Sequence, residues 1–192
     1  MGEGNTAMTN SSQRFHTPGR KFIRRILHWL SRPAFAVLTD LEINGAENLP
    51  EKGPLIMVGN HFSFIDPACF VRVAPWQIEF IGGANMPHAP LSTRIIPLLW
   101  GYHPLYRGTG AKDSLKAAEG ILQQGGILGI FPEAGNWATI LRPARPGTAF
   151  LAARTGALLL PVGLVGLNDV FPSLRRGRRA RLSARSPEIG RP

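Results

Sequence analysis

The sequence is poor in cysteine, with Cys69 as the one thiol among 192 residues. An internal disulfide is therefore excluded, and this cysteine usage is typical of a reducing compartment. There is also no second cysteine and no histidine cluster at the spacing of metal ligands, so nothing in the sequence indicates a metal site. Cys69 follows Pro67 in a short apolar stretch, where we expect it to be a buried small hydrophobe.

Long apolar runs are missing as well. The longest candidate, residues 157–167, contains Pro161 and two glycines and is shorter than the ~18 apolar residues of a membrane-spanning helix. The N-terminus is polar and has no apolar stretch of a signal peptide ahead of its basic residues. We therefore expect an intracellular protein that lies peripherally on the cytoplasmic face of a membrane and has no transmembrane span.

Acidic residues are scarce, 12 Asp and Glu against 22 Lys and Arg, which gives a formal net charge of +10. This balance favours anionic partners: an anionic membrane surface, a phosphorylated substrate, an acidic carrier protein or nucleic acid. The most basic stretch, 174–185, has no aromatic residues for base stacking, so we expect no nucleic acid partner. We interpret it as a solvated basic rim or a contact for lipid headgroups or a carrier. Its arginines are Arg175, Arg176, Arg178, Arg179, Arg181 and Arg185.

The length suits one domain with a sizeable core, preceded by two short segments. Residues 1–20 are mostly small and polar and are predicted to be disordered. Residues 21–40 are predicted to form an amphipathic helical segment at a membrane interface, because apolar residues recur at helical spacing and basic residues take the other face. The alternative is a helix that packs on the domain with a solvated basic face. The apolar set is Phe22, Ile23, Ile26, Leu27, Trp29 and Leu30, and the basic set is Lys21, Arg24, Arg25 and His28.

In residues 41–192, short apolar runs alternate with helical patterns. Strands are predicted at 41–44, 55–59, 78–82, 99–105, 127–131 and 158–162, and helices at 67–73, 111–124 and 147–155. This alternation is typical of α/β proteins. We therefore predict a single domain with a mixed, largely parallel sheet flanked by helices.

A histidine and an aspartate lie five residues apart after the predicted strand 55–59. His61 is expected to emerge at the C-terminal end of this strand, where open α/β sheets have their binding crevices. Asp66, followed by Pro67, has the pattern of a helix N-cap before a first-turn proline. Such a carboxylate can fold back on the imidazole, fix its tautomer and stabilise its charged form, as in His–Asp general-base pairs. The alternative is a surface histidine beside an ordinary N-cap.

Two further sets of polar residues follow predicted strands. An apolar stretch that begins at Gly101 ends at Arg107, whose guanidinium fork suits a phosphate group; His103 nearby is expected to be structural. Glu133 follows the strand 127–131, in a turn that Gly135 allows to bend sharply. Each residue alone would more often be an ion-pair partner at the surface.

Taken in order, these blocks resemble those of the glycerolipid acyltransferase family, typified by 1-acyl-glycerol-3-phosphate acyltransferases. That family has an Asn-His-x4-Asp block, a second block with glycine and arginine, a Phe-Pro-Glu-Gly block and a late proline block. The counterparts here are, in the same order, Asn60-His61 with Asp66, Gly101 with Arg107, residues 131–133 and residues 160–162. The resemblance covers about residues 41–167, most of the chain.

The resemblance implies an O-acyltransferase without metal or cofactor, which uses acyl-coenzyme A or acyl-carrier protein as a co-substrate. The acceptor would be the hydroxyl of a lysophospholipid, with 1-acyl-sn-glycerol-3-phosphate as the favoured one and phosphatidic acid as its product. His61 would be the general base, and Asp66 would orient and charge-stabilise it without taking the proton itself.

The remaining blocks would bind the substrates. Arg107, in the block that begins at Gly101, would clamp the acceptor phosphate, and Glu133 would place the acceptor or support Arg107. Backbone amides near Ser63 or at the Gly135 turn would be the donors to the oxyanion.

The chain departs from the family pattern after Glu133. The family usually reads Glu-Gly-Thr-Arg-Ser, whereas this chain has Ala134, Gly135 and Asn136, so the usual arginine is absent. Arg142 or Arg145 would be the residues to supply that charge. The chain also ends soon after the basic stretch, where members commonly continue, which leaves a shortened C-terminus as one interpretation.

Three other functions remain open from the sequence. The first is acyl transfer to glycerol-3-phosphate or to another lyso-lipid. The second is hydrolysis of acyl thioesters, with His61 activating water. The third is a non-enzymatic basic protein that binds membranes or nucleic acid and makes no use of His61.

Overall fold

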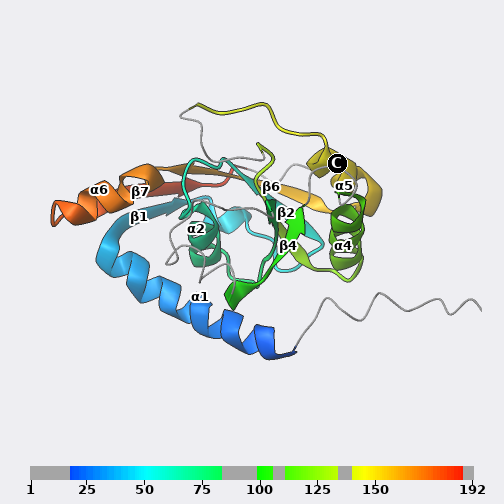
Figure 1. The fold of residues 1–192 in the computed structure, drawn as a ribbon, viewed down its shortest axis with the longest axis horizontal. Coiled ribbons are helices and arrows are strands. Elements are labelled where there is room, and N and C mark those ends of the chain that lie inside the picture. The colour runs from blue at the N-terminus through cyan, green and yellow to red at the C-terminus, as the bar shows by residue number, and fades with distance from the viewer. Residues whose placement is uncertain (1–17, 84–98, 106–110, 134–139, 188–192) are drawn as a thin grey trace, which may run out of the picture.

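The computed structural model describes residues 18–83, 99–105, 111–133 and 140–187. Its centre is a seven-stranded sheet in the order β1-β7-β6-β2-β5-β3-β4 (Figure 1). All neighbouring strands are parallel except β6 and β7, which confirms the predicted mixed, largely parallel sheet. The strands are β1 Thr39–Asn44, β2 Leu55–Gly59, β3 Glu79–Gly83, β4 Tyr102–Leu105, β5 Ile127–Ile130, β6 Leu158–Val165 and β7 Ala180–Arg185.

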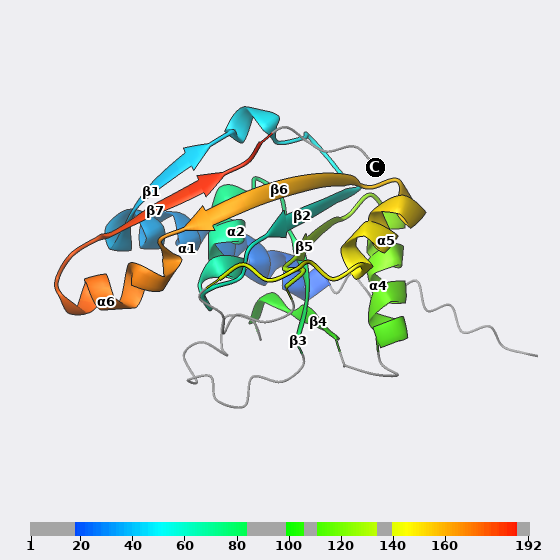
Figure 2. The same ribbon diagram turned by 90° about the horizontal axis from the view of Figure 1, so that it is seen from above.

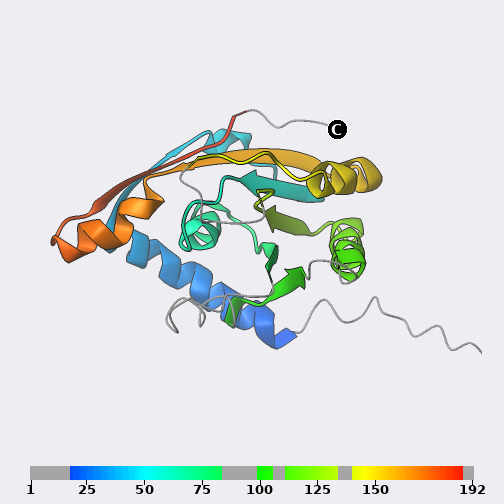
Figure 3. The same ribbon diagram turned by 45° about the horizontal axis from the view of Figure 1, so that its top comes forward.

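Helices cover both faces of the sheet. In Figure 3, α2 lies on one side of the central strands while α4 and α5 lie on the other. Alternate residues of β2 serve the two cores: Leu55 and Met57 pack in the core with α2, and Ile56 packs in the core with α4 and α5, as the period of two in a strand requires. The helices are α1 Pro18–Leu38, α2 Asp66–Val73, α4 Ala111–Gln123, α5 Gly147–Thr155 and α6 Val170–Arg175, with 3-10 turns η2 Ala46–Asn48 and η3 Leu167–Asp169.

One strand was not predicted. β7 lies in the stretch that we interpreted as a basic rim, and it pairs with both β1 and β6 at one edge of the sheet (Figure 2). Its buried residues, Ala180, Leu182 and Ala184, alternate with the exposed Arg181 and Arg185. This alternation was the available signal, and the density of arginines concealed it. The predicted strand at 99–105 was also too long, since β4 begins at Tyr102.

The N-terminal helix α1 begins at Pro18, inside the segment 1–20 that was predicted to be disordered, continues through Pro33 and ends at Leu38, before the predicted end at residue 40. Its buried side carries a charged residue as well as an apolar one, and its exposed side carries large apolar residues. Arg24 and Phe35 are buried, whereas Phe22 and Trp29 are 65% and 68% exposed. The assignment of Arg24 to the solvent-facing basic side is therefore wrong. No helix among the described residues is long and apolar enough to cross a membrane.

Arg24 is buried because Glu79 neutralises it. Its Nη2 lies 2.7 Å from Glu79 Oε2, its Nη1 contacts Oε1, and its Nε donates to the Trp100 carbonyl at 2.7 Å. His103 Nε2 lies 3.4 Å from the same Glu79 carboxylate. Burial alone would raise the pKa of Glu79, but the hydrogen bonds from His103 and Arg24 outweigh it, so the pKa is lowered. These contacts hold α1 against the β3–β4 edge.

Cys69 is buried in α2 as expected. Burial, assisted by the nearby charge of Asp66, raises the pKa of its thiol to about 12. The thiol is therefore protonated at neutral pH and is a packing group there.

The Arg24–Glu79 pair predicts that the difference in stability between the wild-type protein and Glu79→Gln depends on pH. Glu79→Gln should lower the free energy of unfolding at pH 7 by about 3 kcal/mol, because Arg24 loses its buried counter-charge. The pKa of Glu79 is lower in the folded protein than in the unfolded chain. The stabilisation that the ionised Glu79 provides is therefore fully present at pH values above its pKa in the unfolded chain. It is lost as the pH falls through the folded pKa, so the difference should shrink below about pH 4.5. Urea unfolding at pH 7 and at several values below pH 4.5 measures it.

Glu119→Gln is the matched control. Glu119 pairs with Arg154, whose side chain is 57% exposed, and a surface pair of this kind contributes under about 1 kcal/mol. An equal loss in both variants, or a Glu79→Gln difference that does not change with pH, would contradict the assignment.

Candidate active site

The predicted His61–Asp66 contact is present. The loop after β2 turns back on the first residue of α2, and His61 Nδ1 lies 2.9 Å from Asp66 Oδ2. The same oxygen accepts the backbone N–H groups of Phe62 and Ser63, each at 2.7 Å. The Asp66 side chain is almost fully buried, and these three donors compensate the charge that burial would otherwise penalise.

Asp66 was predicted to be the N-cap of α2, and this prediction is wrong. The N-cap of α2 is Ile65, and Asp66 is the first helical residue with Pro67 behind it. Its carboxylate points back to the preceding loop, where it contacts three hydrogen-bond donors. A capping side chain would instead accept hydrogen bonds from the backbone amides of the helix that follows. In the first turn the negative charge still interacts favourably with the helix dipole.

The hydrogen-bond pattern determines the tautomer of His61. Asp66 Oδ2 already accepts two backbone N–H groups, so it acts as an acceptor toward the ring as well, and the hydrogen of a neutral imidazole belongs on Nδ1. Nε2 then carries the lone pair. The His61 side chain is 19% exposed, and within the described residues Nε2 has no hydrogen-bond partner. This nitrogen is available to take a proton from a bound hydroxyl.

Aromatic rings hold the imidazole from one side. Phe131, which follows β5, stacks on His61 with 4.4 Å between ring centroids and 23° between the planes. Behind it, Phe70 of α2 packs on Phe131 at 4.8 Å and is fully buried. In the sequence, Phe131 could be identified only as part of a motif. The ring contributes by fixing the plane of His61.

Glu133 lies beside His61 but bonds to the backbone. Its Oε1 accepts the His61 N–H at 2.9 Å, and its Oε2 accepts the Arg142 N–H at 3.1 Å. Both oxygens of this buried carboxylate are thus engaged by amides, which ties the end of β5 to the histidine loop and to the chain at Arg142. The structure therefore gives Glu133 a supporting position, and its predicted contact with substrate stays a prediction.

Asn60 ties the same loop to β6. Its side-chain amide donates to the Leu164 carbonyl at 2.8 Å, and its Oδ1 accepts the Leu164 N–H at 2.7 Å. The Asn60 side chain thus forms the two hydrogen bonds to β6 that a backbone residue of a paired strand would form, at the point where β2 ends. This role of Asn60 was not predicted, since the two residues are 104 positions apart and no local pattern connects them.

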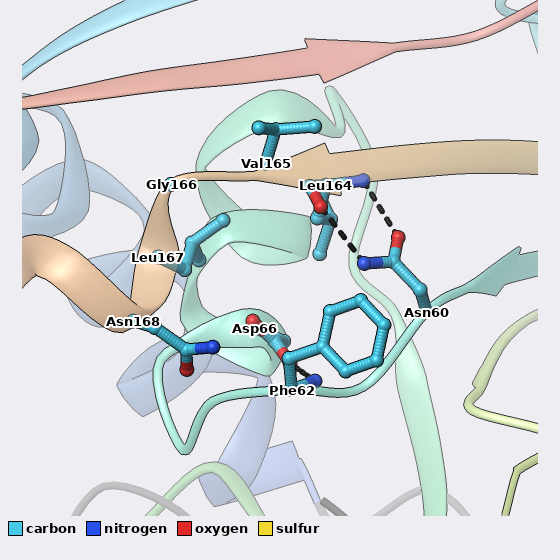
Figure 4. Close-up of a pocket in the computed structure, with 8 residues that line it drawn as sticks. All are labelled: Asn60, Phe62, Asp66, Leu164, Val165, Gly166, Leu167 and Asn168. Atoms are coloured by element: carbon cyan, nitrogen blue, oxygen red, sulfur yellow. Dashed lines mark hydrogen bonds between the residues drawn. The ribbon is translucent and has the colours of Figure 1, made fainter. Parts of the chain in front are cut away.

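A pocket of about 170 Å³ opens beside the pair, between the histidine loop and the end of β6 (Figure 4). Its lining is mostly apolar, with polar groups from Asn60, Asp66 and Asn168. Ser63 lies close by: its Oγ is 3.4 Å from the Leu167 carbonyl, and its backbone N–H already donates to Asp66. That N–H is therefore not free to act as the predicted oxyanion donor.

The structure does not bring the predicted site residue Gly101 to His61. Arg107 and Gly135 lie outside the described residues, as do Ala134 and Asn136. Gly101 is described, but it precedes β4, at the opposite end of the strand from the histidine edge. There its carbonyl lies 3.4 Å from Arg24 Nη2, and a Cβ on it would lie 2.1 Å from Arg20 Nη1. Among the described residues, no group of three or more His, Cys, Asp or Glu side chains is placed to hold a metal ion.

Comparison with known proteins agrees with this geometry. The model of the Acyltransferase family matches residues 40–165, which include β2, the histidine loop, β5 and all of β6. The chain belongs to the acyltransferase family.

Two relatives and one solved structure illustrate the similarity. The 1-acyl-sn-glycerol-3-phosphate acyltransferase of Borreliella burgdorferi is 28% identical over 133 residues, which are 67% of this chain and 52% of the relative. A chloroplastic 1-acyl-sn-glycerol-3-phosphate acyltransferase of Brassica napus is 28% identical over 140 residues, 71% of this chain and 40% of the relative. This acyltransferase chain thus spans about half the length, or less, of the curated relatives it matches.

The solved structure confirms the fold. The crystal structure of the 1-acyl-sn-glycerophosphate acyltransferase from Thermotoga maritima superposes with a TM-score of 0.66 and 23% sequence identity. The superposition covers 90% of this acyltransferase chain and 71% of that one.

The aromatic packing behind His61 predicts the effect of one small substitution. A Cβ on Gly59 would lie 2.5 Å from Phe70 Cζ, so Gly59→Ala should displace Phe70 and, through Phe131, the ring of His61. We expect the free energy of unfolding to fall by about 1–3 kcal/mol, with the side-chain signals of Phe131 and His61 shifted in NMR spectra. Gly82→Ala is the control, because no described atom lies within 4 Å of its Cβ position. Equal effects of the two substitutions would argue against the packing.

Proposed function

We propose that this protein transfers a fatty acyl group from a thioester donor to the hydroxyl of a lysophospholipid, with 1-acyl-sn-glycerol-3-phosphate as the acceptor. The observation that carries the proposal is the His61–Asp66 pair: its hydrogen bond leaves Nε2 of His61 without a partner among the described residues, and Asp66 also lines the pocket. Membership of the acyltransferase family and the names of its relatives support the same chemistry.

The reaction needs one base and no covalent intermediate on the protein. The acceptor hydroxyl oxygen attacks the thioester carbonyl carbon while its proton moves to His61 Nε2. Asp66 stabilises the resulting imidazolium through the Nδ1 hydrogen bond. The tetrahedral intermediate then expels the sulfur, and the thiol leaves with the proton that Nε2 returns. A general base of this kind contributes roughly 10²–10⁴-fold to the rate.

Binding of the two substrates is the less direct part of the proposal. Acyl-coenzyme A and acyl-carrier protein are both suitable donors, and the exposed arginines of α6 and β7 suit either acidic carrier. Arg107 remains the proposed clamp for the acceptor phosphate. Glycerol-3-phosphate or another lyso-lipid is the alternative acceptor, and an acceptor panel separates them.

Substitution of His61 tests the proposal. With a labelled acyl thioester and 1-acyl-sn-glycerol-3-phosphate, the wild-type protein should form phosphatidic acid, and His61→Ala should lower the rate by at least about 100-fold. His103→Gln is the matched control, because His103 lies by Glu79 and not at the pocket. Release of free fatty acid at the same rate with and without acceptor would indicate a hydrolase. Equal acyl transfer by His61→Ala would remove His61 from the mechanism.

We also propose that α1 attaches the protein to a membrane surface. Apolar side chains of α1 point outward, including Phe22, Ile26 and Trp29, while the buried side of the helix carries Arg24. A helix that faces water would ordinarily show the opposite arrangement. Exposed aromatic and aliphatic residues flanked by Lys21, Arg25 and Arg32 are typical of interfacial helices.

Vesicle binding measures this attachment. Phe22→Ser combined with Trp29→Ser should abolish co-flotation with anionic vesicles, and the exposure of both side chains means that the fold should survive. Phe150→Ser, which changes an exposed aromatic residue on α5, is the control and should leave flotation unchanged. Loss of binding in the control alone would place the membrane contact elsewhere.

A further inference from the structure

A histidine and two arginines lie where α1 packs against α2. His28 and Arg32 lie one turn apart on α1, and Arg72 lies in the last turn of α2. The pKa of His28 is lowered, first by burial and then by the positive charges of Arg32 and Arg72, while a hydrogen bond at the Val71 backbone acts in the opposite direction. Both arginines are thus within electrostatic range of His28.

This cluster lacks a counter-charge. In the part of the chain that the structure describes, no carboxylate forms an ion pair with Arg32 or Arg72. The Nε of Arg72 is buried and has no hydrogen-bond partner there. A buried donor without a partner is costly and is rare in native proteins, and like charges held together add repulsion. A bound anion would satisfy the donor and neutralise the cluster.

The position of the cluster indicates where such an anion would come from. At 100° per residue, Arg32 and Arg25 lie on one flank of α1, between the buried side with Arg24 and the exposed apolar stripe with Trp29. A helix with its apolar stripe in the bilayer interface has this flank at the level of the lipid phosphates. The guanidinium fork of arginine matches a phosphate group in bidentate fashion.

We propose that His28, Arg32 and Arg72 form a binding site for the phosphate group of an anionic membrane lipid. The site is separate from the pocket that Asp66 lines, and it rests on the membrane attachment proposed above for the source of its ligand. Arg72 would donate its buried Nε–H to the phosphate, Arg32 would close the site from the exposed side, and His28 would contribute a further donor.

The ring signals of His28 report occupancy of the site directly. Titration of the full-length protein with dihexanoylphosphatidic acid below its micelle concentration should shift these signals saturably, and Arg72→Met should abolish the shift. Inorganic phosphate is the second probe and should saturate at a concentration at least about tenfold higher, since it lacks the chains that contact the apolar stripe. Equal midpoints would overturn a lipid as the ligand, and no shift with either probe would overturn the site.

Vesicle binding separates this site from general attraction to the membrane. One surface cation near an anionic bilayer contributes about fivefold to binding, so Arg25→Gln should weaken binding by about that factor. Arg25 is not among the residues that shift His28. Arg72→Met should weaken binding to vesicles with phosphatidic acid about tenfold more than Arg25→Gln does.

The outcomes are distinguishable from failure of the other proposals. Equal losses in Arg72→Met and Arg25→Gln would overturn the site and leave membrane attachment intact. Absence of vesicle binding in the wild-type protein would refute the attachment, while the titration with the short-chain lipid would still test the site. Acyl transfer to a soluble acceptor should be equal in the wild-type protein and in Arg72→Met. If the proposed acyl-transfer function is wrong, only this assay would show it, because the binding experiments do not depend on acyl transfer.

Discussion

A single carboxylate oxygen organises the site. Asp66 Oδ2 gathers the imidazole Nδ1 and two backbone N–H groups within 2.9 Å, and this geometry has three consequences. It curls the loop that leaves β2, it places a negative charge in the first turn of α2, and it directs the lone pair of His61 to Nε2. Loop shape, helix start and base chemistry therefore depend on the same carboxyl group, and its burial is tolerated because three hydrogen bonds satisfy it.

The surrounding strands make this arrangement rigid. Asn60 bonds to Leu164 of β6, and Glu133, just beyond β5, bonds to the backbone of His61. The loop after β2 is thus fastened to both strands that neighbour β2 in the sheet. Phe131 and Phe70 fill the space behind the imidazole. A base held from several sides loses little freedom when a substrate binds, and such preorganisation is a large part of enzymatic rate enhancement.

What the sequence could predict depended on the range of each interaction. The strand at 55–59 and the helix at 147–155 were predicted with the bounds that the structure has, because a continuous buried run and a clear helix end are local signals. The contact of His61 with Asp66 followed from their spacing. The bond between Asn60 and Leu164 could not be inferred, since it spans 104 residues. Arg24 turned inward because Glu79, 55 positions away, compensates its charge, and helical periodicity alone cannot reveal such a partner.

The tautomer of His61 is the most direct test of this account. Nitrogen NMR of the protein labelled at its histidine rings distinguishes a protonated from an unprotonated ring nitrogen. At a pH where His61 is neutral, we expect a proton on Nδ1 and a lone pair on Nε2, and a loss of this preference in Asp66→Ala. A proton on Nε2 in the wild-type protein, or the same tautomer in both proteins, would contradict the central role given to Asp66.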